Sequence, residues 1–74
     1  MSMMTVKDIQ KVITSATSIH LCVAKTVDDA INEHSQYRYT FNKYTNLSNC
    51  YAKLEVVAIY PESKDDLEVW ALEA

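Results

Sequence analysis

The stretch LEVVAIYPESKDDLEVWAL, residues Leu54–Leu72, decides the fold. Two apolar, β-branched runs flank a polar interruption that begins at Pro61, and this pattern predicts a strand, a turn and a strand. Strands that follow each other so closely usually pair antiparallel, so we expect a C-terminal β-hairpin. Strict alternation along the first strand predicts one face made by Leu54, Val56 and Ala58.

Both faces of this hairpin are apolar, whereas a small sheet with one helical layer needs only one apolar face. The second face must therefore be covered by the middle helices, by another copy of the chain, or by a partner. Trp70 lies on the second strand of the hairpin, and the pattern leaves it to the core or to an interface.

The N-terminal residues carry the signals of a helix. Thr5 and Asp8 have the spacing of a capping box. The side chains expected on its apolar face are Val6, Ile9, Val12, Ile13 and Ala16. We expect the helix to run from Val6 to Ser15 or Ala16.

The middle of the chain alternates between strand and helix signals. SIHLCVA (18–24) and QYRYTF (36–41) have the period-two pattern of strands. TVDDAINEH (26–34) repeats the capping spacing and predicts a short helix, and residues 47–51 suggest one or two helical turns. We therefore expect a single α+β domain, 1–74, with a mainly antiparallel sheet of three or four strands, the N-terminal helix packed on one face and the C-terminal β-hairpin.

Composition excludes several functions. The chain has 74 residues and no glycine, which excludes glycine-based phosphate loops and leaves positive-φ positions to Asn or Asp. A net charge of −3 argues against non-specific binding to nucleic acid or to an anionic membrane. The N-terminal residues do not resemble a signal peptide, and no apolar run approaches the roughly 20 residues of a membrane span. We expect a soluble, cytoplasmic protein.

Cysteine and histidine do not form a convincing site. Cys22 and Cys50 are expected to be reduced and buried. His20 and Cys22 should share a strand face, and with His34 and Cys50 they could supply four metal ligands, but the tight ligand pairs of structural zinc sites are missing. We therefore expect no metal, no cofactor and no enzymatic activity.

The segment 36–53 is basic and rich in tyrosine, which raises the alternative of a small nucleic-acid-binding protein. That alternative would use Arg38, Lys43, Lys53 and Tyr44. Strand geometry weakens it, because the rings of Tyr37, Tyr39 and Phe41 should face one way and Arg38 the other. The rings are then left to the core or to a protein interface.

The C-terminal part is acidic, with six acids and one lysine from Leu54 to Ala74. This asymmetry favours an oriented surface, and we hypothesise a non-enzymatic protein-binding module. Its candidate contacts are Tyr37, Tyr39, Tyr44, Lys43 and Trp70. Its acidic rim is expected to be Glu62, Asp65, Asp66 and Glu68. A further alternative is a homo-oligomeric structural protein, at its simplest a homodimer.

The stretches TVKDIQKVI, SIHLCVA and LEVVAIYPESKDDLEVWAL also resemble, in style and spacing, small α+β accessory proteins encoded by bacterial phages and prophages. That resemblance covers about half of the chain and transfers no functional residue. It implies a product that binds and blocks a host protein, such as a component of a defence system, in the cytoplasm of a bacterial host.

Overall fold

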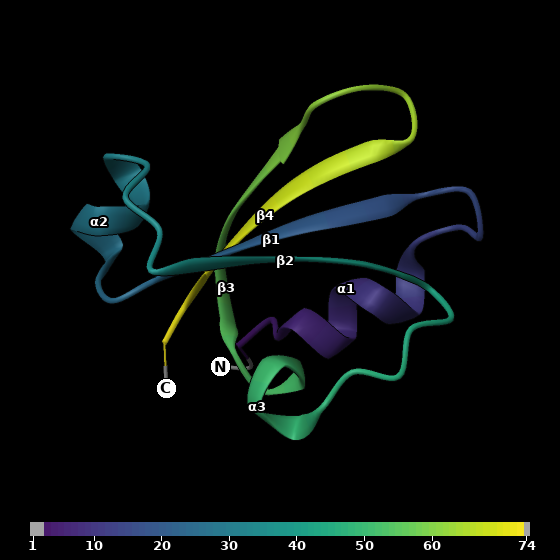
Figure 1. Cartoon of the computed structure of the whole chain (residues 1–74), viewed down its shortest axis with the longest axis horizontal. Coiled ribbons are helices and arrows are strands. Elements are labelled where there is room, and N and C mark those ends of the chain that lie inside the picture. Colours follow the sequence, from purple (N-terminus) through teal and green to yellow (C-terminus); the bar gives the residue numbers. More distant parts are fainter. Residues whose placement is uncertain (1–2, 74) are drawn as a thin grey trace.

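The computed structural model describes residues 3–73. Its elements follow the chain in the order α1 (Val6–Val12), β1 (Ser18–Ala24), α2 (Val27–Ile31), β2 (Tyr37–Asn42), α3 (Asn49–Ala52), β3 (Glu55–Pro61) and β4 (Asp66–Leu72). The expected α+β class and the C-terminal hairpin of β3 and β4 are confirmed. Figure 1 shows α1 and α3 together on one side of the sheet, with α2 at one end.

The four strands form one mixed sheet in the order β2-β1-β4-β3. β3 pairs antiparallel with β4, as the sequence led us to expect, and β1 pairs antiparallel with β2. The two central strands, β1 and β4, run parallel, which corrects the expectation of a mainly antiparallel sheet. Both central strands carry buried residues on both faces, the usual condition of parallel strands.

Helix α1 begins as the sequence predicted and ends earlier. The Thr5 hydroxyl accepts from the Asp8 amide, and the Asp8 carboxylate accepts from the Thr5 amide, which completes the capping box. The helix stops at Val12 rather than at Ser15 or Ala16, because Ile13 takes an extended conformation and turns its side chain into the core. Val12, expected on the apolar face, is 79% exposed, and Ala16 is exposed as well.

The main core lies between the sheet and the layer made by α1 and α3. Apolar side chains of β1, β2 and β4 meet those of α1 there, including Ile9, Leu21, Phe41 and Val69. A second, smaller cluster lies on the opposite side of the sheet, where Ala30 of α2 covers Cys22, Ala24 and Trp70. The sequence left three candidates for covering the second face, and the structure shows that a middle helix, α2, covers part of it.

A β-bulge at Val57 changes which side chains of β3 point to each layer. The register shifts between Val56, which pairs with Ala71, and Ala58, which pairs with Trp70. Ala58 therefore packs with the second cluster, so the expectation that it shares a face with Val56 is wrong. A bulge adds one residue to one strand and inverts the alternation beyond it.

Helix α2 ends in a Schellman motif that lacks its usual glycine. The amide of His34 donates to the Asp29 carbonyl at 2.8 Å, and the amide of Glu33 donates to the Ala30 carbonyl at 3.2 Å. Glu33 holds φ at 60°. The expectation that positive φ would fall to Asn or Asp is therefore wrong at this position.

Candidate interaction surface on the uncovered sheet face

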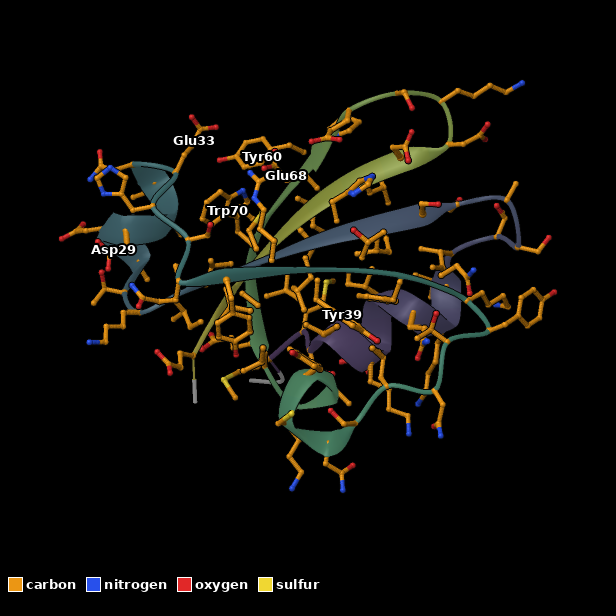
Figure 2. All side chains as sticks on the ribbon, in the orientation of Figure 1. Asp29, Glu33, Tyr39, Tyr60, Glu68 and Trp70 are labelled. Atoms are coloured by element: carbon orange, nitrogen blue, oxygen red, sulfur yellow. The ribbon has the colours of Figure 1, made fainter. Side chains whose placement is uncertain are left out.

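The side of the sheet opposite α1 is covered by α2 at one end only, and the remainder carries polar side chains. We call this remainder the uncovered face; it consists of His20, Arg38, Thr40, Tyr60, Asp66 and Glu68, with Glu62 at its margin. Figure 2 shows Tyr60 and Glu68 on this side of the sheet and Tyr39 on the other.

The strand registers place one residue from each strand in a row across this face. Thr40 of β2 pairs with His20 of β1, His20 pairs with Glu68 of β4, and Glu68 pairs with Tyr60 of β3. Directly paired residues project to the same side of a sheet, so the four side chains are neighbours. The row joins residues that lie up to 48 positions apart in the sequence, from His20 to Glu68.

His20 links two strands through both ring nitrogens. Its Nε2 lies 3.1 Å from Asp66 Oδ1, and its Nδ1 lies 3.3 Å from the Thr40 hydroxyl. An ionised carboxylate only accepts, so Nε2 carries a proton, and in the neutral ring Nδ1 accepts from Thr40. The Ser63 hydroxyl donates to Asp66 Oδ2 at 2.7 Å. This hydrogen bond has the largest effect on the pKa of the Asp66 carboxyl, which it lowers, and the hydrogen bond from His20 lowers that pKa further.

Glu68 receives two partners in the middle of the face. The Arg38 guanidinium lies 3.5 Å from its Oε1, and the Cys22 thiol donates to the same oxygen at 3.6 Å. The Glu68 side chain is only 14% exposed. Burial raises the pKa of the Cys22 thiol to about 11, so Cys22 stays a protonated donor near neutral pH.

Trp70 forms the boundary between the uncovered face and α2. It is fully buried beside Cys22 and Ala30, which decides its assignment in favour of the core. Its indole Nε1 is buried without a hydrogen-bond partner among the described residues. Trp70 therefore supports the surface from beneath and is not a contact on it.

The expected acidic rim is partly assembled on this face. Asp66 and Glu68 lie on it and Glu62 stands at its margin, 4.0 Å from His20 Nε2. Asp65 lies in the exposed turn, where its backbone carbonyl accepts from the Ser18 amide.

The tyrosines expected as contacts are distributed over the other side of the molecule. Tyr39 stacks on Tyr51 of α3 with ring centroids 4.6 Å apart, and Phe41 is buried in the main core. Tyr37 is partly exposed and meets Tyr51 edge-on at 6.0 Å. The three rings of β2 therefore grade from core to surface, while Tyr44, 76% exposed, lies in the loop after β2.

The basic residues of segment 36–53 are not gathered on one surface. Arg38 is paired with Glu68 on the uncovered face. Lys43 donates to the carbonyls of Lys11 and Ile13 at 3.2 and 3.1 Å, and so caps the end of α1. Lys53 follows α3 on the opposite layer. A hollow of about 280 Å³ beside Lys43 is lined by Gln10 and Lys11.

Sequence reasoning missed three members of the face, His20, Thr40 and Tyr60, as contacts. The alternation of β1 and β2 could have placed His20 and Thr40 on the same side as Arg38, had their register been known. The bulge at Val57 could not be read from the sequence, and the bulge is what directs Tyr60 to this side. Cys50, expected to be buried, is exposed.

The chain has no significant match among protein-family models, curated proteins or solved structures. Within residues 3–73, no helix is long and apolar enough to cross a membrane. In the same part of the chain, no group of three or more His, Cys, Asp or Glu side chains is arranged to hold a metal ion.

Proposed function

We propose that this chain is a non-enzymatic protein-binding module that uses its uncovered face to hold a basic surface of a partner protein. The observation that carries the proposal is that Glu62, Asp66 and Glu68 share this face with the exposed ring of Tyr60, which lies directly opposite Glu68. Three carboxylates face one guanidinium there, so the face has an excess of negative charge while His20 is neutral. Complementary charge steers a partner to such a surface and suppresses wrong partners.

Tyr60 supplies the apolar part of the proposed contact. Its side chain is 47% exposed and lies directly opposite Glu68. Tyrosine is enriched at interfaces because it brings a large rigid area, a polar tip and little entropy loss. An exposed ring on a face that carries carboxylates suits a partner patch in which arginine or lysine side chains border an apolar depression.

The polar chain from Asp66 through His20 to Thr40 has the connectivity of an acid, a base and a hydroxyl. Catalysis by such a chain also needs an oxyanion site and a substrate cleft beside the hydroxyl. Here His20 and Thr40 stand on neighbouring strands of the sheet surface, and each is bound to a partner within it. We therefore propose a positioning role, in which His20 fixes Asp66 and Thr40 on the face.

The resemblance to phage-encoded accessory proteins suggests the class of partner. On that basis the partner is a host protein of the bacterial cytoplasm, and occupation of its basic surface blocks it. A basic surface that normally meets nucleic acid, as in a defence nuclease, has the matching charge.

The test uses matched pairs of variants in the full chain. The immobilised chain retains partners from a bacterial lysate, the retained protein is purified, and its affinity is titrated against each variant. Tyr60→Ala is compared with Tyr44→Ala, because both tyrosines are exposed. Glu62→Gln is compared with Glu73→Gln, because both changes remove one exposed carboxylate.

We expect Tyr60→Ala to weaken binding about tenfold or more, as loss of an interface anchor does. Glu62→Gln should slow association and flatten its salt dependence. The variants at Tyr44 and Glu73 should bind like the wild-type chain. Equal losses of affinity in Tyr60→Ala and Tyr44→Ala would refute the proposal. So would a retained protein that binds Tyr60→Ala and Glu62→Gln as tightly as it binds the wild-type chain.

A further inference from the structure

The outer edge of β2 is the second feature that invites a partner. β2 lies at one end of the sheet order, so within residues 3–73 one side of its backbone has no neighbouring strand. The direction of each backbone group follows from β1. The amide of Ser18 donates to the Asp65 carbonyl, and the carbonyl of Ala24 accepts from the Glu73 amide. The even-numbered residues of β1 therefore direct their backbone amides and carbonyls toward β4. The odd-numbered residues of β1 then direct their backbone amides and carbonyls toward β2.

The register now identifies the free groups of β2. Ile19, Leu21 and Val23 pair with Phe41, Tyr39 and Tyr37, so those three residues of β2 direct their amides and carbonyls to β1. The intervening residues direct theirs outward. Asn42 is already satisfied, because its amide donates to Thr45 Oγ1 and its carbonyl accepts from the Thr45 amide. Among the turn and cap hydrogen bonds of residues 3–73, none uses the backbone of Arg38 or Thr40.

This edge lacks the usual protection against strand addition. It contains no lysine or proline, and no register shift interrupts its pairing with β1. Its one cation, Arg38, reaches across β1 to Glu68 on β4 and so leans away from the edge. The opposite edge is protected: β3 has the bulge at Val57, ends in Pro61, and is bridged at Glu55 by Thr5.

We infer that a second copy of this chain pairs with β2 along this edge, antiparallel, with Tyr39 on the twofold axis. In a continuous sheet, residues that oppose each other across the axis must project to the same side. That condition allows only registers centred on a residue. Among them, the register centred on Tyr39 pairs the free groups of Arg38 with those of Thr40 of the second copy, and the reverse, which gives four backbone hydrogen bonds.

The neighbouring registers are poorer. Centring on Arg38 sets two guanidinium side chains directly opposite each other, and like charges in that position are destabilising. Centring on Thr40 sets Arg38 against Asn42, whose amide and carbonyl are already used by Thr45. The self-complementary pattern of this short edge is therefore what selects a second copy over an unrelated strand.

The aromatic side of the edge supports the same pairing. In this register Tyr39 lies opposite Tyr39 of the second copy, on the side of the sheet that carries α3. Cross-strand aromatic pairs stabilise antiparallel strands. From His34 to Lys53 the sequence has no acidic residue, so the negative charge of the two copies stays away from the axis. The axis is perpendicular to the sheet, so both uncovered faces lie on the same side of an eight-stranded sheet.

The first test measures the mass of the full chain by analytical ultracentrifugation from about 10 µM to about 1 mM, over which mass action populates a weak dimer. We expect the mass to rise toward twice 8.4 kDa. Thr40→Pro removes the outward amide without touching the ladder to β1. It eliminates two of the four hydrogen bonds and should raise the dimer dissociation constant about tenfold or more.

The second test reads the register directly and covers the case in which Thr40→Pro fails to fold. In a Cys50→Ser background, Tyr39→Cys places two thiols on the axis with Cα atoms about 4.5 Å apart, within disulfide range. Thr40→Cys is the matched control, because its two copies lie diagonally, about 7–8 Å apart. We expect rapid covalent dimer formation at position 39 and slow formation at position 40. A strict monomer at about 1 mM, or faster cross-linking at position 40 than at position 39, overturns the inference. The affinity of the uncovered face for a basic partner is measured separately, so failure of the dimer leaves the proposed function untouched.

Discussion

Glu33→Gly offers a direct test of the backbone geometry that ends α2. Glu33 occupies the left-handed position of the Schellman motif, with φ at 60°, where glycine is the usual residue. The side chain of any other L-residue brings Cβ close to the following carbonyl oxygen there. The substitution removes that contact and leaves the two hydrogen bonds of the motif in place, namely those donated by the amides of Glu33 and His34.

Two opposing terms set the magnitude. Relief of the left-handed conformation is worth about 1–2 kcal/mol. The greater freedom of glycine in the unfolded chain takes back about 0.5–1 kcal/mol. The net gain in the free energy of unfolding is about 0.5–1 kcal/mol, which for a domain of this size raises Tm by about 2–8 °C.

Thermal unfolding followed by circular dichroism measures the change, with two controls. Asn32→Gly alters the preceding residue, whose φ is −86°, so glycine there relieves nothing and should lower Tm. Glu33→Ala removes the same carboxylate and retains Cβ, which separates the charge from the backbone. If Glu33→Gly is no more stable than Glu33→Ala, the left-handed strain is absent and the reasoning fails.

Three further predictions concern side chains that the structure places in defined contacts. In native protein a thiol reagent should modify Cys50 alone, and Cys22 should react only after unfolding, because burial holds its pKa at about 11. The pKa of Asp66 is lowered in the fold, first by the hydrogen bond from the Ser63 hydroxyl. The carboxylate therefore stabilises the fold above its unfolded pKa of 3.8, and this contribution is lost as the pH falls below that value. Asp66→Asn should make the stability depend less on pH in this acid range, measured by fluorescence during acid unfolding. Lys43→Met should lower the stability measured in urea by about 0.5–1.5 kcal/mol, because the ammonium caps two carbonyls at the end of α1.

Local signals explain why most elements could be predicted from the sequence. The capping box of Thr5 and Asp8 and the period-two alternation of SIHLCVA and QYRYTF depend on residues within one turn or one strand. Those signals fix where an element begins and which side chains share a face. They do not fix its end when a distant side chain intervenes, as Lys43 does at the end of α1.

Strand pairing was predictable only where the connection is short. β3 and β4 are joined by a turn, and their antiparallel pairing follows from that. The parallel pairing of β1 with β4 joins segments more than 40 residues apart, from Ser18 to Asp66, and nothing local announces it. Both faces of β4 are apolar in the sequence, which is typical of a central strand, whereas the second face of β1 carries Ser18 and His20 and gives no such signal.

The candidate surface depends on these two unpredictable features together. The parallel pairing brings Glu68 beside His20, and so joins the acidic hairpin to β1 and β2. The bulge then decides which residue of β3 completes the row. Strict alternation from Val56 would direct Tyr60 into the layer under α1 and Ile59 onto the acidic face; the extra residue at Val57 exchanges the two. A single bulge therefore replaces an aliphatic side chain by a tyrosine beside Glu68, and gives the acidic sheet face the exposed aromatic ring that the proposed contact uses.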